Sequence, residues 1–132
     1  MQKTSYILAI VLATLLFSHC TSNDRALHRR LQQEASLLNI TTPQMLNNFI
    51  RLDGASVTSD NRFQYRYTVL NTLVDNYTIE SWLQDFERIV RDIYFNNPNM
   101  AIFRDNNVIM EYIFSNEAGE IIREFQVHSE VY

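Results

Sequence analysis

The sequence predicts an α+β fold in the order helix, strand, strand, helix, strand, strand. Three observations predict it. Residues 62–70 alternate aromatic and polar side chains with a period of two, which is typical of a strand with one buried face. Residues 108–115 and 121–131 form two further strand-like segments around a turn with Gly119, whose freedom at positive φ suits a hairpin. Between these regions, apolar side chains recur at helical spacing: Trp82, Leu83, Phe86, Ile89, Val90, Ile93 and Tyr94.

The first element is a helix that we expect to end near Asn39. Ser22-Asn23-Asp24 supplies N-cap chemistry ahead of it. Its apolar stripe is narrow and consists of Leu27, Leu31, Ala35 and Leu38. Thr41-Thr42-Pro43 ends the helix, and Pro43 is expected to start a short extra turn.

The second helix and the sheet follow from similar signals. Residues 49–57 predict a strand, and Ser59 to Asn61 predict the turn after it. Thr78 is expected to cap the long helix, and Pro98 to open a short helical turn through Phe103. Because consecutive strands joined by short turns pair antiparallel, we expect a four-stranded antiparallel sheet with the long amphipathic helix packed on one face.

The first 20 residues resemble an export signal. Lys3 precedes an apolar run from Tyr6 to Phe17, and polar residues follow. The run is too short to cross a bilayer, which needs roughly 20 apolar residues. A buried N-terminal helix is the disfavoured alternative, because a small domain does not readily bury a helix that is apolar all round. We therefore expect a signal peptide over 1–20 and a single α+β domain over 21–132.

Cys20 is the only cysteine and lies where the apolar run turns polar. Phe17-Ser18-His19-Cys20 resembles a bacterial lipobox, in which the cysteine is acylated and becomes the new N-terminus; His19 departs from that pattern. Signal peptidase could instead cut after Cys20, or cut earlier and leave a thiol that pairs between chains. Cys20 could also simply end the apolar run. Lipidation is favoured, since the sole cysteine falls where that chemistry requires it and the domain is then free of thiols.

Composition and motifs argue against nucleic-acid binding and catalysis. Lys and Arg total 11, and Asp and Glu total 15. Loss of Lys3 with the signal gives a formal net charge of 10 − 15 = −5, and a negatively charged protein binds nucleic-acid phosphates poorly. Without the signal, the remaining histidines are His28 and His128, which lack the local spacing of a metal site. No nucleophile motif and no phosphate-cradling loop occurs. We expect no cofactor, no metal and no enzymatic activity.

Alternation places the last two strands' side chains on two faces. The more apolar face should meet the long helix. The other face would carry an apolar strip rimmed by charge, which is the composition of a contact site. Its partner-binding candidates are Arg62, Arg66, Ile109, Glu111, Ile113, Ile122 and Glu124. The alternative, slightly favoured, is that the first helix covers this strip with Leu27, Leu31 and Leu38.

The stretch "NNPNMAIFRDNNVIMEYIFSNEAGEIIREFQV", with "RLDGASV" and "FQYRYTVLN" upstream, is similar to small exported bacterial proteins of uncharacterised function. Its layout also resembles the small lipoprotein pilotins of type II secretion. The resemblance covers most of residues 45–127. It implies a protein that binds a secretin segment and helps to place it in the outer membrane. Such pilotins usually carry a disulfide, which this domain lacks.

The expected function is therefore a non-enzymatic binding or assembly module, exported to the periplasm or anchored in the outer membrane of the bacterial envelope. Its partner would be another envelope protein, and its membrane contact would be the lipid at Cys20. The alternative is an exported inhibitor or immunity-type protein, in which the acidic surface binds a basic enzyme.

Overall fold

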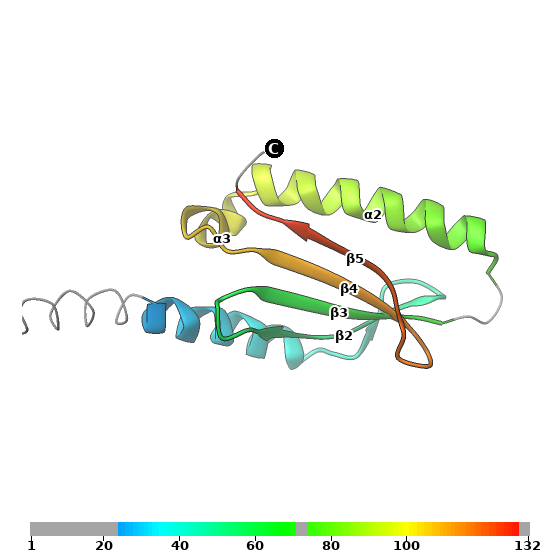
Figure 1. Cartoon of the computed structure of the whole chain (residues 1–132), viewed down its shortest axis with the longest axis horizontal. Helices are drawn as coiled ribbons and strands as arrows, with labels where there is room; N and C mark the ends of the chain where they lie inside the picture. Colours follow the sequence, from blue (N-terminus) through cyan, green and yellow to red (C-terminus); the bar gives the residue numbers. More distant parts are fainter. Residues whose placement is uncertain (1–23, 71–73, 130–132) are drawn as a thin grey trace, which may run out of the picture.

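The computed structural model describes residues 24–70 and 74–129. The predicted signal segment, Cys20 and the Ser22-Asn23 part of the predicted cap lie outside these residues. Figure 1 shows a sheet with α2 along its β5 side and the helix of residues 24–39, here called the first helix, along its β2 side.

The sheet has five strands in the spatial order β1-β2-β3-β4-β5. Their bounds are β1 Gln44–Met45, β2 Ile50–Val57, β3 Phe63–Val69, β4 Met110–Asn116 and β5 Ile121–Val127. The other elements are α2 (Asn76–Asn96), the 3-10 helix η1 (Pro98–Met100) and α3 (Ala101–Asp105). Every predicted strand and helix is therefore present.

The predicted four-stranded antiparallel sheet is wrong in two respects. The sheet is mixed, because β3 and β4 pair in parallel while the other pairs are antiparallel. The helix that the sequence predicted between these strands, α2, returns the chain to the end of the sheet where β3 began, and a crossover of this kind produces parallel neighbours. The fifth strand is β1, which extends the sheet where the sequence predicted a turn after Pro43.

One face of the sheet forms the core. Phe63, Tyr65 and Tyr67 of β3 are register partners of Met110, Tyr112 and Phe114 of β4, so their side chains share a face. Phe86 of α2 packs its ring against four aromatic rings of this face: Tyr67, Tyr112, Phe114 and Phe125. The alternation read in the sequence is thus confirmed, and the aromatic set faces α2.

The long helix begins three residues earlier than predicted. Asp75 is the N-cap, and its carboxylate accepts a hydrogen bond from the backbone N–H of Thr78 at 2.7 Å. Thr78, the expected cap, is thus inside the first turn. The hydrogen bond also holds the pKa of Asp75 below its ordinary value, since a carboxylate that accepts a backbone N–H is favoured in its charged form.

The first helix packs on the same face as α2. It buries Leu31 and Ala35 in the core. Glu34, Leu37 and Leu38 lie around Phe63 and Tyr65. The expectation that this helix covers the second sheet face is therefore wrong. The second face, called the open face below, has no described helix packed on it.

Asn39 joins the end of the first helix to a bulge in β2. Its side-chain amide donates to the carbonyl oxygen of Ala55 and accepts from the N–H of Ala55, both at 2.8 Å. The register shifts between Leu52 and Gly54. Gly54 has φ +157°, and a Cβ there would lie 2.9 Å from the Asn39 Oδ1. Glycine is thus the residue that lets the amide approach this strand.

We expect Asn39→Ala to lower the free energy of unfolding by roughly 1–3 kcal/mol, because two backbone groups of β2 would lose their partner. Urea denaturation measures this. Asn96→Ala is the control, since that amide bonds only Asp92 on the exposed surface of α2. Equal effects of the two substitutions would show that the Asn39 bridge adds nothing.

Candidate functional site

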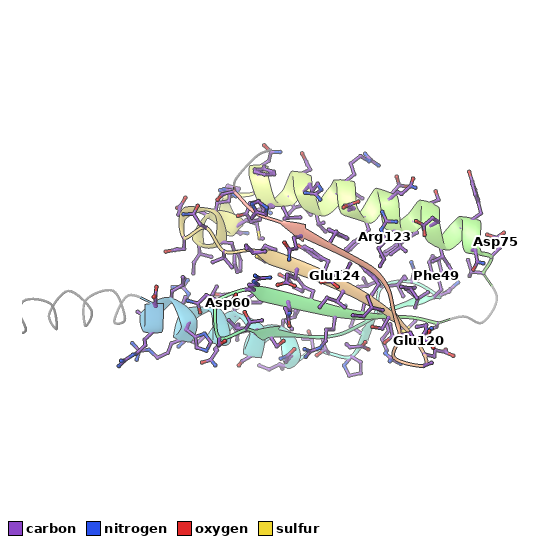
Figure 2. The ribbon with its side chains drawn as sticks, viewed as in Figure 1. Phe49, Asp60, Asp75, Glu120, Arg123 and Glu124 are labelled. Atoms are coloured by element: carbon purple, nitrogen blue, oxygen red, sulfur yellow. The ribbon has the colours of Figure 1, made fainter. Side chains whose placement is uncertain are left out.

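The orientation of α2 is set by ionic contacts on one of its flanks. Arg123 of β5 pairs with Glu80 at 2.5 Å and with Glu87 at 3.4 Å, and Figure 2 labels Arg123 between β5 and α2. Arg91 lies 5.9 Å above the ring of Phe125. The flank with Glu80, Glu87 and Arg91 is therefore turned toward β5, and the opposite flank toward the β2 side of the sheet, along which the first helix lies (Figure 1).

That opposite flank is apolar and partly exposed. Trp82 stacks on Phe86 and meets Phe49, just before β2, edge to face at 6.0 Å. At 100° per residue, Ile89 and Ile93 fall on the same flank as Trp82. Ile89 is 49% exposed and Ile93 is 40% exposed. Two isoleucines beside a tryptophan form an apolar surface that the described residues leave uncovered.

The facing side of the first helix also borders a hollow of about 430 Å³. It lies between that helix, β3 and the η1–α3 corner. Its lining residues are mostly apolar: Glu34, Leu37, Leu38, Thr41, Phe63, Tyr65, Asn99, Met100 and Phe103. Trp82, Ile89 and Ile93 of α2 do not line this hollow. We use the name interhelical groove for the hollow and the exposed α2 flank taken together. The walls of the groove are mostly apolar, and its polar groups are Glu34, Thr41, Asn99 and the hydroxyl of Tyr65.

Three tyrosines form a cluster beneath the groove. The rings of Tyr65 and Tyr112 stack at 5.0 Å, and the ring of Tyr67 stacks on Phe114 at 4.5 Å. Burial raises the pKa of Tyr65 to about 12, with a smaller contribution from the negative charge of Glu34. Burial also raises the pKa values of Tyr67 and Tyr112 well above the ordinary value. The cluster therefore stays neutral and aromatic across the physiological pH range.

The tyrosine pKa values predict a loss of stability at alkaline pH. The folded chain keeps the Tyr65 proton up to about pH 12, whereas the unfolded chain releases it near pH ~10. The stabilisation that Tyr65 contributes is thus complete below pH ~10, and it is lost as the pH rises through the pKa of Tyr65 in the folded chain. Urea denaturation below and above this pH range should show that the free energy of unfolding falls less for Tyr65→Phe than for the wild type. Tyr77→Phe, at an 84% exposed position, should follow the wild type.

The structure brings two of the sequence candidates together as an ion pair. The Arg62 guanidinium lies 3.2 Å from Glu111 Oε1 and 3.0 Å from Asp60 Oδ2. Glu111 is 4% exposed, and its carboxylate charge is offset by Arg62. Both acids raise the pKa of Arg62, the hydrogen bond to Glu111 most. These contacts tie the β2–β3 turn to β4.

Other candidates lie on the open face as expected. Ile113 is half-buried opposite Glu124, which is exposed, and Arg66 donates to the Ser56 hydroxyl at 2.9 Å. Ile109, half-buried directly before β4, alternates with the core residue Met110. Next to them, Arg51, Asp53 and Thr68 bond one another. Much of the polar surface of this face is thus paired within the domain.

Ile122 does not belong to this group. It lies with Ile79 and Leu83 of α2 around a hollow of about 300 Å³ on the core side. The register shifts between Phe114 and Ser115, so that Ser115 pairs with Ile121 and Phe114 with Arg123. Ile122 is the extra residue of this bulge, and simple alternation fails there. Ile121, the partner of Ser115, takes the place on the open face that the sequence assigned to Ile122.

The interhelical groove was missed in the sequence. A signal for it exists: the apolar arc of α2 includes Ile89 and Ile93 in addition to the residues that one sheet face can bury. The described residues contain no group of three or more His, Cys, Asp or Glu side chains that could hold a metal ion. In the same part of the chain, no helix is both long and apolar enough to cross a membrane.

Solved structures with this fold include two pilotins, as the sequence resemblance implied. The pilotin EpsS of the Vibrio vulnificus type 2 secretion system is 14% identical, with 83% of this chain and 94% of that chain covered and a TM-score of 0.63. The type II secretion pilotin AspS of Vibrio cholerae is 14% identical, with 83% of this chain and 95% of that chain covered and a TM-score of 0.57. A candidate secreted protein of Pseudomonas aeruginosa is 17% identical, with 78% of this chain and 89% of that chain covered and a TM-score of 0.64. At these identities the likeness shows the fold alone.

No curated protein matches the sequence. A family model, described as a domain of unknown function (DUF8479), matches residues 26–122. This range includes both helix flanks of the groove and strands β1 to β4, and it stops after the first two residues of β5. The chain therefore belongs to the DUF8479 family.

Proposed function

We propose that this protein is a non-enzymatic envelope protein that holds an apolar segment of another envelope protein in its interhelical groove. The observation that carries the proposal is the exposed apolar flank of Trp82, Ile89 and Ile93 beside the groove hollow. Tryptophan and tyrosine with aliphatic neighbours are typical of the energetic centre of a protein interface. The fold shared with two pilotins supports a partner of this kind.

The proposal includes export and a lipid at Cys20. Intact mass of the mature protein, taken from the membrane fraction of its own cells, tests both. We expect a chain that starts at Cys20 and carries acyl groups. A chain that starts after residue 20 would remove the anchor and leave the groove proposal standing, because the two rest on different residues.

A photo-crosslinking amino acid at position 93, introduced in the protein's own cells, tests the groove. We expect a discrete adduct with one envelope protein, identified by mass spectrometry, and direct binding of a synthetic peptide of the crosslinked segment. The same amino acid at position 121, an exposed isoleucine at the end of the open face, is the matched control. An adduct from position 121 or 113 alone would assign the partner to the open face.

The inhibitor alternative predicts a different partner. An acidic protein surface that binds a basic enzyme forms a complex that weakens as salt screens the charges. A crosslinked partner that is a soluble enzyme, released at moderate salt, would favour that alternative. Binding that persists in salt fits an apolar groove.

A further inference from the structure

Eight of the ten arginines are engaged within the domain. The total of 11 basic residues less Lys3 gives ten arginines, all of them in the described part of the chain. Seven of the eight contact an acid or a hydroxyl, and Arg104 donates to the carbonyl oxygens of Tyr94 and Asn97. Arg25 and Arg29 are the two that form no ion pair or side-chain hydrogen bond with any other described residue.

Arg25 and Arg29 lie next to each other on the surface of the first helix. Residues four apart project from the same face of a helix, one turn apart. Both are exposed. They border a hollow of about 410 Å³ that is also lined by Asp24, His28, Ser59 and Asn61. Two guanidinium groups without a partner among the described residues therefore flank one depression at the start of the described chain.

This end of the helix is held in place by the β2–β3 turn. The His28 Nδ1 lies 2.8 Å from Asn61 Oδ1, and Asn61 Nδ2 donates to the carbonyl oxygen of Asp24 at 3.3 Å. Asn61 has φ +62°, a left-handed conformation that asparagine tolerates better than most residues. The two arginines thus project from a fixed platform and not from a loose terminus.

The geometry points to a binding site for the phosphates of anionic lipid headgroups at Arg25 and Arg29, so that this end of the domain contacts the membrane surface. Guanidinium groups match phosphate oxygens in a two-pronged geometry. The position of this site at the membrane rests on the proposed function, in which a lipid is attached to Cys20. Four residue steps separate Cys20 from Asp24, which allows at most about 14 Å of extended chain.

Charge supports the membrane as the occupant. The chain without its signal has a net charge of 10 − 15 = −5, so an anionic bilayer repels most of its surface. The other arginines are engaged within the domain, and the hollow beside Arg25 and Arg29 is lined by a single carboxylate, Asp24, so the two guanidinium charges exceed the one negative charge there. Attraction is then confined to the tethered end, which would orient the domain on its lipid anchor.

Arginine-specific modification with phenylglyoxal, read by mass spectrometry, tests the site. The mature protein from its own cells is placed on vesicles of phosphatidylcholine, with or without phosphatidylglycerol as the anionic lipid. We expect anionic vesicles to slow modification of Arg25 and Arg29 by roughly fivefold each, the factor that about 1 kcal/mol per arginine at a membrane surface represents. High salt should abolish the protection. Arg88, on α2 and more exposed than its Asp85 partner, is the internal control and should react equally throughout.

Equal modification on the two kinds of vesicle would overturn the site even if Cys20 is acylated, because the anchor alone protects without regard to lipid charge. Protection by inorganic phosphate without vesicles would assign the arginines to a soluble phosphate compound and overturn the membrane contact. In an Arg25→Gln/Arg29→Gln variant, we expect Arg30, the next residue of the helix, to be modified at the same rate on anionic and on neutral vesicles. The intact mass reports separately on the anchor.

Discussion

An Ile89→Glu/Ile93→Lys variant should fold like the wild type and lose the partner segment. The two substitutions replace the exposed apolar flank of α2 with a Glu and a Lys four residues apart, in the order that stabilises a helix. We expect the free energy of unfolding to change by less than about 1 kcal/mol. Binding of the crosslinked peptide should weaken by roughly 2–4 kcal/mol, or thirtyfold to a thousandfold, because charge replaces the apolar centre of the interface.

Isothermal titration with the peptide and urea denaturation give the two quantities. Ile121→Glu is the matched control, because it places a charge at another exposed isoleucine, 59% exposed and remote from the groove, and should leave binding unchanged. Wild-type affinity in the double variant would refute the groove. If Ile113→Asp folded normally and lost the partner, the open face would be the binding surface.

Arg62→Met should destabilise the protein more than any other substitution of a surface arginine here, because it removes the cation beside a buried carboxylate. The side chain of Arg62 is 40% exposed, whereas that of Glu111 is 6% exposed. Removal of Arg62 leaves a buried carboxylate without its cation. Removal of Glu111 leaves a half-exposed arginine that water and Asp60 still solvate. The two single variants should thus differ, with Glu111→Met the milder of the two.

An Arg62→Met/Glu111→Met double variant should recover most of the lost stability, since no charge remains buried. Urea denaturation of the four proteins closes the cycle. Arg66→Met, which loses only the hydrogen bond to Ser56, should change stability by about 0.5 kcal/mol or less. Additive single effects would show that Arg62 and Glu111 do not interact. The cycle also separates the structural role of these two open-face candidates from any role in binding.

Local pattern was enough for most of the secondary structure. Period-two alternation gave β3 and β4, and the helical repeat gave α2, because each pattern reports which side of one element is buried. It could not give β1, whose two residues are too few to show a period. Nor could it give the parallel pairing of β3 with β4, which depends on where α2 returns the chain.

The candidate site was less predictable. Arg62, Arg66, Ile109, Glu111, Ile113 and Glu124 follow from alternation on uninterrupted strands, and the structure places them on the open face. The predicted position of Ile122 is wrong because one extra residue in β5 shifts the register by one, and a shift of one residue moves a side chain to the other face. No local pattern marks such a bulge in this stretch.

The sequence by itself determined the α+β class, the aromatic core face, the long helix and the family resemblance, because each is carried by residues close together in the chain. The tertiary structure alone decided that both helices pack on one face of the sheet. That choice brings Glu34 and Leu38 of the first helix to the same hollow as Tyr65 of β3, which is far from them in sequence. It leaves the charged face open and creates the interhelical groove, where the exposed isoleucines of α2 become a surface for a partner.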